Sequence, residues 1–508
     1  MTRAAGPRPS TLSGQTLTTL AAAVAGRVVG AGDLVVTGIA HDSRAVRPGD
    51  VYAALRGAHA DGNEFIDDAV AAGAVAVLTD RDAPDDVLPH GVAAAVVVDD
   101  VRAVLGRAAS VVYGEPSRAL DVVGVTGTNG KTTTAYLLHA GLRAAGRSAA
   151  LIGTIETRIN DERFESAHTT PEAPDLQALL AVIRERGLDS VAMEVSSHGL
   201  ALGRVAGTTF AVAVFTNLTQ DHLDFHDDME SYFAAKATLF EPAFTRRAVV
   251  NVDDAWGRRL RDGSRVPTTT FSVTRDADWR AVDVRTTRDG TAFVAEGPQG
   301  SWPVQLQLLG AFNVSNALGA LAALACLDVD IGRAAAGLGE LLGVEGRLER
   351  VDAGQPWLAV VDYAHTPDAV AAMLGTLRAL TPGRLIVVLG CGGDRDPGKR
   401  PLMGAAAMRG ADVAVLTSDN PRSEDPGVIL AAMLAGARAT TGGEVVVQID
   451  RARAIRQAAV IAGPDDTVVV AGKGHEQGQV FADRVVDFDD RVVLRAVIAA
   501  LHPAEAAR

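Results

Sequence analysis

Short apolar runs recur along the chain, and longer amphipathic segments rich in alanine separate them. Runs of this length bounded by turn-forming residues predict buried strands, and the segments between them predict helices. In the first part of the chain, the predicted strands lie within residues 34–44, 49–55, 74–80 and 93–100. The proline-containing stretch at 113–121 then predicts a linker.

Two further blocks repeat the alternation of strand and helix. The second block has predicted strands at 120–125, 149–154, 190–195 and 211–218; the third begins near residue 346 and has them at 358–364, 384–390, 411–419 and 466–474. This alternation predicts parallel sheets that are covered by helices on both faces. We therefore predict an α/β protein with three domains: a smaller N-terminal α/β domain at 1–118, a central parallel-sheet domain at 119–345 and a C-terminal Rossmann-like domain at 346–508.

Composition narrows the function classes. The 508 residues are 48% hydrophobic and carry a net charge of −14, which argues against nonspecific binding to nucleic acid or to an acidic membrane. The two cysteines, Cys326 and Cys391, indicate a reducing compartment. The chain has neither a signal-peptide core nor a run approaching the ~20 apolar residues that cross a bilayer. We expect a cytoplasmic protein with no membrane span.

Lysine is rare in this chain. Only four of the 48 basic residues are lysines: Lys131, Lys236, Lys399 and Lys473. A chain that uses arginine almost everywhere keeps lysine where a compact ammonium or a modifiable amine is needed. The alternative is an arginine-biased composition with four chance survivors, but three of the four lie in glycine-rich loops.

The segment "GVTGTNGKTTT" at 124–134 follows a predicted strand and precedes a predicted helix. Its spacing departs from the full Walker pattern, because Val125 stands where the first glycine belongs. The remaining Gly127-x-x-Gly130-Lys131-Thr132 still allows backbone N–H groups to surround a phosphate at a helix N-terminus. Lys131 would then reach the terminal phosphates and Thr132 would bind Mg²⁺. The alternative is a glycine-rich turn without a ligand.

Two other predicted strands end in polar loops. The first loop supplies Glu194, Ser196 and His198, and the second supplies Asp221, His222, Asp224 and His226. One such loop alone could be an ordinary surface turn. Two of them beside a phosphate loop indicate magnesium and substrate handling.

The segment "LTSDNPRSEDPG" at 416–427 places one arginine among turn-forming residues. Arg422 can bind a carboxylate through two N–H groups, and Asn420 offers both a donor and an acceptor. Arg395 could add a second cation, and Glu476 could bind an ammonium. This combination suits a diamino dicarboxylate. The alternative is a surface arginine that pairs with Glu424 or Asp425.

A dinucleotide site is a weaker interpretation of the third block. The segment "GCGGDRD" fails the Gly-x-Gly-x-x-Gly pattern, because Arg395 stands at its last position.

Several motifs together resemble the Mur ligases, ATP-dependent amide-forming enzymes of peptidoglycan synthesis. "GTNGKTTT", "MEVSSHGL", "TNLTQDHLDFH", "GAFNVSNALGA", "GRLE" and "DYAHTPDA" stand in the order of that family, and the resemblance covers nearly the whole chain. Within the family, "HTTPEAPDLQ", "GCGGDRDPGKRP" and "DNPR" resemble the branch that joins meso-diaminopimelate to UDP-N-acetylmuramoyl-L-alanyl-D-glutamate. The resemblance implies an acyl-phosphate intermediate formed by ATP.

The resemblance also implies roles for individual residues. The implied ATP contacts are Gly127, Thr128, Asn129, Gly130, Lys131, Thr132, Thr133, Asn313, Asn316, Arg347 and Asp362. The implied contacts of the UDP-linked dipeptide are Ser43, Thr169, Thr170, Ser196 and Arg204. The implied diaminopimelate contacts are Arg395, Asp419, Asn420, Pro421, Arg422, Gly472 and Glu476.

The implied catalytic residues are Lys131, Lys236, His222 and Glu194. Lys236 matches a lysine that carries a CO2-derived carbamate. That modification would convert its ammonium into an anion able to hold two Mg²⁺ ions together with Thr132, Glu194 and His222.

Three residues depart from the family pattern: Ala58, His168 and Glu345. Two rival functions stay open, namely a sibling ligase that adds L-lysine or glutamylates a folate, and a non-catalytic nucleotide-binding scaffold. We expect a monomer.

Overall fold

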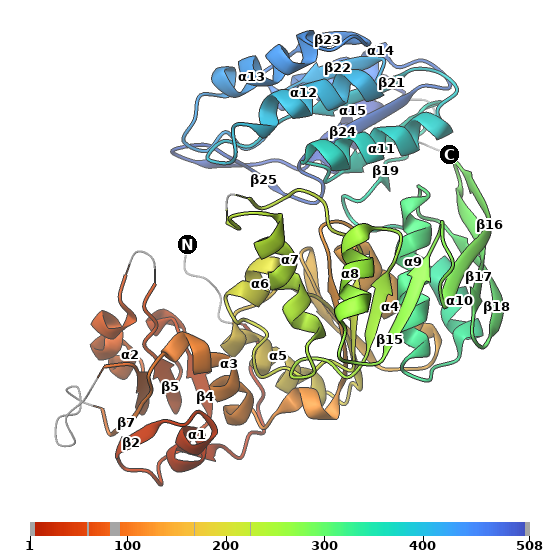
Figure 1. Ribbon diagram of the computed structural model, residues 1–508. Coiled ribbons are helices and arrows are strands. Elements are labelled where there is room, and N and C mark those ends of the chain that lie inside the picture. The colour runs from red at the N-terminus through yellow and green to blue at the C-terminus, as the bar shows by residue number, and fades with distance from the viewer. Residues whose placement is uncertain (1–5, 58–59, 82–91, 167, 224, 503–508) are drawn as a thin grey trace.

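The computed structural model describes residues 6–57, 60–81, 92–166, 168–223 and 225–502 (Figure 1). Ala58 and Asp224, both singled out above, lie outside these ranges. Three main sheets follow one another along the chain, each with its own helices. The predicted α/β class is confirmed. The exact domain boundaries stay a prediction.

The N-terminal sheet has the strand order β2-β7-β6-β5-β4. Its strands are β2 (Arg27–Gly30), β4 (Gly38–Ala40), β5 (Asp50–Ala53), β6 (Ala76–Thr79) and β7 (Ala94–Val97). Helices α1 (Leu17–Ala23), α2 (Ile66–Ala71) and α3 (Val101–Val112) accompany it. Strands β4 to β7 are parallel, whereas β2 pairs with β7 in antiparallel orientation.

The central sheet has the order β11-β10-β9-β12-β8-β13-β14-β15-β16-β17-β18. Its parallel middle consists of β8 (Asp121–Thr126), β9 (Ala149–Ile152), β12 (Ser190–Glu194), β13 (Val212–Phe215), β14 (Ala248–Asn251) and β15 (Thr268–Ser272). Its helices are α4 (Lys131–Ala144), α5 (Ala173–Glu185), α6 (Ser197–Ala201), α7 (Met229–Ala237), α8 (Ala255–Gly263), α9 (Phe312–Ala325) and α10 (Ile331–Gly339).

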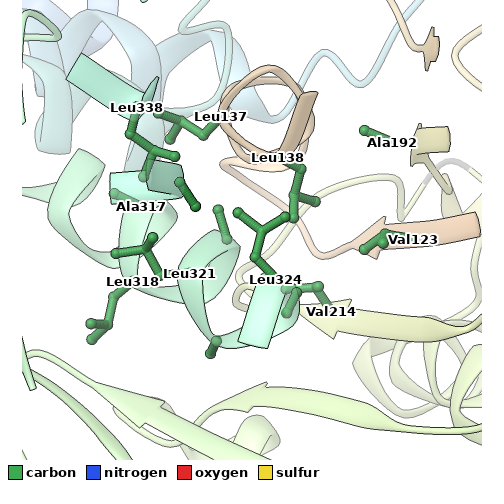
Figure 2. Close-up of a cluster of buried hydrophobic side chains, with 14 of the residues drawn as sticks. Val123, Leu137, Leu138, Ala192, Val214, Ala317, Leu318, Leu321, Leu324 and Leu338 are labelled. Carbon is green, nitrogen blue, oxygen red and sulfur yellow. The ribbon is translucent and has the colours of Figure 1, made fainter. Parts of the chain in front are cut away.

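Alternate residues of β8 face opposite layers, because successive side chains of a strand point to opposite faces. Val123 and Val125 pack with leucines of α4, α9 and α10, such as Leu137 and Leu321 (Figure 2). Val122 packs on the other side with side chains of α5 and α7. Burial on both faces explains why these strands are almost wholly apolar in sequence.

The edges of the central sheet consist of strands that we did not predict. Strands β10 (Glu156–Ile159) and β11 (Glu162–Glu165) form an antiparallel hairpin at one edge, and β16 (Trp279–Thr287), β17 (Gly290–Gly297) and β18 (Gly300–Leu306) form antiparallel pairs at the other. These strands carry many polar residues because one face of an edge hairpin meets solvent. The predicted parallel sheet is therefore confirmed for the strands that the sequence located, and the antiparallel edges add to it.

The C-terminal sheet has the order β19-β20-β24-β21-β22-β23. Its strands are β19 (Glu349–Arg350), β20 (Leu358–Asp362), β21 (Leu385–Leu389), β22 (Val413–Leu416), β23 (Glu444–Val447) and β24 (Thr467–Ala471). Helices α11 (Pro367–Leu380), α12 (Lys399–Gly410) and α13 (Pro426–Arg438) pack on one face, and α14 (Arg451–Ile461) and α15 (Asp490–Leu501) pack on the other. A short hairpin, β25 (Gly478–Val480) with β26 (Val485–Asp487), follows β24.

Polar contacts join the central and C-terminal regions away from their cores. Glu345, one of the three departures from the family pattern, pairs with Arg163 of β11 at 3.2 Å and with Arg491 of α15 at 2.8 Å. Arg288, between β16 and β17, donates to the carbonyls of Leu380 and Asp465 at 2.9 Å each. Apolar packing adds to these contacts, because Leu309 of the central region lies in the hydrophobic core of the C-terminal region. No helix within the described ranges is long and apolar enough to cross a membrane.

Candidate active site

The phosphate loop occupies the turn between β8 and α4. Gly127 and Gly130 have φ angles of 151° and 86°, values that side chains disfavour. A Cβ atom at Gly127 would also collide with the Thr216 hydroxyl, and one at Gly130 would collide with the Asn316 amide oxygen. Both glycines are therefore required by local geometry, and they let the loop lead directly into the N-terminus of α4.

Two lysines converge on the same backbone carbonyl of this loop. Lys131 Nζ donates to the oxygen of Gly127 at 3.0 Å and to that of Thr128 at 2.8 Å. Lys236 Nζ, on α7, donates to the Gly127 oxygen at 2.8 Å and lies 4.5 Å from the centre of the Tyr232 ring.

Burial and nearby charges alter the proton affinity of both amines. Lys236 is only 1% exposed, and burial together with the Lys131 ammonium lowers the pKa of Lys236 well below its ordinary value. Burial also lowers the pKa of Lys131, although the carboxylates of Glu194 and Asp221 oppose that shift. An amine with a lowered pKa is more often in the neutral, nucleophilic form.

A buried carboxylate faces the first turn of α4. Glu194 ends β12, is 1% exposed and accepts a hydrogen bond from the Thr132 hydroxyl at 2.9 Å. Its other oxygen accepts from the backbone N–H of Thr154 at 2.7 Å. These contacts bring a carboxylate and a hydroxyl together beside the phosphate loop.

His222 lies in the loop after β13 with a φ angle of 55°. Its backbone N–H donates to Asp221 Oδ1 at 2.9 Å, and its ring lies 4.8 Å from that of His198, measured between centroids. The ring is half-buried, and loss of solvation lowers the pKa of His222 to about 4 against the pull of Asp221. The imidazole is therefore neutral at pH 7, which is the form that binds metals.

A cavity of about 860 Å³ opens between the phosphate loop and the C-terminal sheet. It is lined by most of the predicted ATP, metal and dipeptide residues: Thr128, Asn129, Gly130, Lys131, Thr132, Thr133, Thr169, Glu194, Ser196, Arg204, His222, Lys236, Asn316, Arg347 and Asp362. Arg395, which we predicted to bind diaminopimelate, lines it as well. His168, the second departure, also lines it. Side chains from the central and C-terminal sheets thus face one shared space.

Within the described residues, no group of three or more His, Cys, Asp or Glu side chains could hold a metal ion. The predicted set contains only two such residues, Glu194 and His222; its other members are Thr132 and Lys236. These four unmodified side chains therefore supply too few ligands for a metal ion, and a metal site would need further oxygen atoms.

The C-terminal region closes the cavity through Arg347. Its guanidinium lies 4.3 Å from the centre of the Tyr363 ring, and Nη2 donates to the Thr132 hydroxyl at 3.3 Å. Asp362 accepts from the backbone N–H groups of Leu348 and Ala364 at 2.7 and 2.8 Å. Burial raises the pKa of Asp362, and Arg347 opposes that shift.

The predicted dipeptide residues do not all lie together. Thr169, Ser196 and Arg204 line the cavity, whereas Thr170 is fully buried behind it and accepts from the backbone N–H of Ser196 at 2.9 Å. Ser43 lies in the N-terminal region, in the short 3-10 helix Ser43–Ala45, away from the cavity lining.

The two asparagines of α9 also differ from each other. Asn316 lines the cavity and donates to Asn313 Oδ1 at 2.9 Å, while Asn313 donates to the carbonyl of Leu309 at 2.8 Å and does not line the cavity. Asn313 therefore acts here as a support for Asn316.

Three loops meet at the C-terminal ends of β21, β22 and β24. Asn420, 5% exposed, donates through Nδ2 to Glu476 Oε2 at 2.8 Å. Its Oδ1 accepts from Lys473 Nζ at 2.9 Å and from the backbone N–H of Val480 at 3.0 Å. Both lone pairs of this oxygen are therefore used, so Asn420 does not offer the acceptor that we predicted from its side chain type.

Glycine and neighbouring groups shape the same loops. Gly472 has a φ of 110°, and a Cβ there would lie 2.7 Å from Asp419 Oδ2. Gln479 Nε2 donates to the carbonyl of Asp419 at 2.7 Å, and Asp419 is 8% exposed. Pro421 is also buried. These predicted residues build the walls of the loop cluster and do not line the 860 Å³ cavity.

Arg422 has a φ of 51°, and its Nη1 donates to the carbonyl of Gly393 at 2.6 Å. No carboxylate among the described residues forms an ion pair with it. Glu424 pairs instead with Arg400 at 2.7 Å, and Asp425 accepts from Gly427 N at 2.7 Å. The alternative of an Arg422–Glu424 or Arg422–Asp425 pair is therefore wrong.

Comparison with known families follows the same division of the chain. Residues 35–113 match the family described as "Mur ligase family, catalytic domain", residues 125–324 match "Mur ligase middle domain" and residues 346–474 match "Mur ligase, glutamate ligase domain". A protein of Streptomyces avermitilis named UDP-N-acetylmuramoyl-L-alanyl-D-glutamate--2,6-diaminopimelate ligase is 55% identical over 504 residues, covering 98% of this chain and 99% of the relative. The chain belongs to the Mur ligase family.

Other Mur ligases are similar over almost their full length. A Streptomyces coelicolor protein with the same ligase name is 54% identical, covering 98% of this chain and 99% of the relative. A solved structure of a ligase of that name is 35% identical with a TM-score of 0.68, covering 96% of this chain and 99% of the other.

Some residues of this Mur ligase were missed as site residues. Lys473, with 0% side-chain exposure, contacts both Asn420 and Glu476. Tyr363 and His365 line the cavity from the C-terminal region. The rarity of lysine could have pointed to Lys473. Its partners Asn420 and Glu476 lie 53 and 3 residues away along the chain. The periodicity of the sequence does not reveal a contact between residues as far apart as Lys473 and Asn420.

Proposed function

We propose that this Mur ligase adds meso-diaminopimelate to the D-glutamate γ-carboxylate of UDP-N-acetylmuramoyl-L-alanyl-D-glutamate, using ATP. Near-full-length similarity to relatives named for that reaction carries the proposal. The absence of a carboxylate partner for Arg422 among the described residues supports the choice of amino acid, since a guanidinium in that position suits a second carboxylate. We further propose that the protein acts in the cytoplasm as a monomer.

The phosphate loop and Lys131 would bind the triphosphate. The backbone N–H groups at the start of α4 suit an anion. Among the described residues, Lys131 Nζ donates only to carbonyl oxygens, which a phosphate can replace. Asn316, Arg347 and Asp362 would complete the ATP site, because they line the same cavity from two sides.

Magnesium fits part of the predicted donor set. Mg²⁺ prefers oxygen ligands, and the Thr132 hydroxyl and the Glu194 carboxylate lie within 2.9 Å of each other. Lys236 as an ammonium does not fit a cation site. Its buried amine suits addition to CO2, in which a new N–C bond forms and a proton is released.

The resulting carbamate would give Lys236 the oxygen donors that the set lacks. Thr132, Glu194, His222 and carbamylated Lys236 would then hold two Mg²⁺ ions. Bound there, the ions would neutralise negative charge on the phosphates.

The reaction would proceed in two steps. The D-glutamate γ-carboxylate attacks the γ-phosphorus of ATP, so that an acyl phosphate forms and ADP leaves. The neutral amine of diaminopimelate then attacks the acyl carbon, loses a proton and expels phosphate, leaving an amide. Lys131 stabilises the charge on the transferred phosphoryl group, and Thr169, Ser196 and Arg204 orient the dipeptide.

The C-terminal region would deliver the amine to the acyl phosphate. Arg347 already contacts Thr132 across the cavity. The three loops that follow β21, β22 and β24, here named the amino-acid loops, adjoin the cavity through the neighbouring rings of Tyr363 and His475, 5.3 Å apart. Closure over the cavity would exclude water, which would otherwise hydrolyse the acyl phosphate.

A panel of amino acids with the purified protein, ATP and the nucleotide substrate tests the proposal. We expect ADP and phosphate release with meso-diaminopimelate that depends on both co-substrates. Faster release with L-lysine would identify the sibling ligase. Release with glutamate and a folate, or none with any combination, would support the other rivals.

A further inference from the structure

The buried amine of Lys473 contacts two of the residues proposed to bind diaminopimelate. Its Nζ donates to Asn420 Oδ1 at 2.9 Å and to Glu476 Oε2 at 3.0 Å, and its side chain is fully buried. A lysine ammonium carries only donors, so each atom that faces it must be an acceptor.

This constraint decides which way the Asn420 amide points. The backbone N–H of Val480 also donates to the atom that faces Lys473, at 3.0 Å. Two donors on one side require the oxygen there, which leaves Nδ2 on the other side. One N–H of Nδ2 binds Glu476 at 2.8 Å, and the second has no acceptor among the described residues.

Lys473 also makes the two oxygens of the Glu476 carboxylate different from each other. Oε2 accepts from both Lys473 and Asn420, whereas Oε1 accepts no hydrogen bond within the described part of the chain. The Glu476 side chain is 33% exposed, so Oε1 can meet a ligand. The pair therefore presents one N–H donor and one carboxylate oxygen.

The same contacts connect Asn420 to the backbone of Arg422. Its backbone N–H donates to the carbonyl of Val480 at 3.0 Å, and the N–H of Val480 donates to Asn420. Lys473 and Val480 both donate to Asn420 Oδ1, so the Asn420 amide and the Arg422 backbone are linked through Val480. The guanidinium itself donates to the carbonyl of Gly393 at 2.6 Å.

We propose that Lys473 is a positioning residue that fixes amino-acid specificity by aiming the Asn420 N–H at a ligand carboxylate while leaving Glu476 Oε1 for the ligand ammonium. The inference rests on the proposed function. Without Lys473, the Asn420 amide could rotate and present its oxygen, which repels a carboxylate and tolerates a ligand that lacks one.

The test compares Lys473→Met with Arg456→Met in the full-length protein. Methionine keeps the buried volume but removes the donor, and Arg456 is an exposed cation of α14 with no ion pair among the described residues. We expect Lys473→Met to raise the KM for meso-diaminopimelate at least about tenfold and to lower the preference for it over L-lysine by a similar factor. The KM for ATP should stay within about twofold, and Arg456→Met should match the unmodified protein.

The outcomes separate the two claims. If the unmodified protein does not ligate diaminopimelate, the proposed function fails. If it does so and Lys473→Met keeps its KM and preference, only the inference about Lys473 is overturned. A fall in kcat alone would show a merely structural role and would overturn it as well.

A second variant covers the case in which Lys473→Met does not fold. Asn420→Asp keeps an oxygen for Lys473 and Val480 but replaces the Nδ2 donor by another oxygen. We expect it to lose preference for meso-diaminopimelate to a similar extent. Retained preference in this variant would overturn the inference.

Discussion

The phosphate loop and the amino-acid loops differ in the hydrogen-bond acceptors of their lysines. At the phosphate loop, Lys131 and Lys236 lie together and, within the described ranges, donate only to backbone carbonyls. At the amino-acid loops, Lys473 is already paired with Glu476.

This difference in acceptors predicts that substitutions at the two sites will have different kinetic effects. At the phosphate loop, Lys131 is the group proposed to meet the phosphates and Lys236 the group proposed to be modified, so removing either should chiefly weaken catalysis. At the amino-acid loops, Lys473 already has a carboxylate partner, and Arg422 has none among the described residues, so a ligand carboxylate has one specific cation to meet. Changes there should chiefly alter which amino acid binds.

The largest effect is expected at Lys131. Lys131→Ala removes the cation nearest to the transferred phosphoryl group, and kcat/KM should fall by at least about 1,000-fold. Coupled detection of ADP measures this loss. Arg143→Ala, on the exposed end of the same helix, is the control and should keep near-normal activity. Comparable activity in the two variants would refute the phosphate role.

Lys236→Ala should lower kcat about 100-fold or more, because the proposed carbamate oxygens are lost. Short carboxylic acids such as acetate should restore part of the activity by supplying a carboxylate in the space left by the side chain. Acetate should not rescue Lys131→Ala, where a cation is missing. Equal rescue of both variants, or of neither, would contradict the carbamate.

Arg422→Ala should raise the KM for meso-diaminopimelate about 10- to 100-fold, because a charge-assisted hydrogen bond contributes about 1.5–3 kcal/mol. The KM for ATP should hardly change. The exposed Arg409→Ala, on α12, is the matched control. A change of less than about 1 kcal/mol in kcat/KM for diaminopimelate would be too small for a bidentate contact.

The last prediction concerns stability instead of catalysis and tests whether water is excluded around α4, the helix that follows the phosphate loop. His139 of α4 is 5% exposed, and burial lowers its pKa from 6.5 to about 4. Between these values the unfolded chain binds a proton that the folded protein does not. The free energy of unfolding should therefore fall as pH drops from about 6.5 to about 4, by about 3 kcal/mol for this group.

Urea unfolding at several pH values measures that slope. His139→Gln should reduce the slope over this range, and the two proteins should show little pH dependence of their difference above pH 7. An unchanged slope would mean that His139 is already solvated in the folded protein.

The sequence predicted those parts of the fold and the site that are formed by residues close together in the chain. The apolar runs around Val123 and Val214 located the parallel strands, because burial on both faces leaves a continuous pattern. Gly127, Gly130 and Lys131 were recognisable because the phosphate loop is built from adjacent residues.

The antiparallel edges and the amino-acid loops were harder. The strand Trp279–Thr287 mixes polar and apolar residues, and nothing local indicates which sheet it joins. The orientation of Asn420 depends on Lys473 and Val480, which are 53 and 60 residues distant. Such partners become visible only when the strand order brings their loops together.

The Gly127 carbonyl oxygen has a wider consequence. It accepts from two amines that come from different helices. We therefore expect the free-energy effects of changing these two side chains to be coupled. Freeing one alters the local field and the bonding available to the other. The loss of activity on replacing both lysines should therefore be well below the product of the two separate losses. Modification of the Lys236 amine should likewise change the pKa of Lys131.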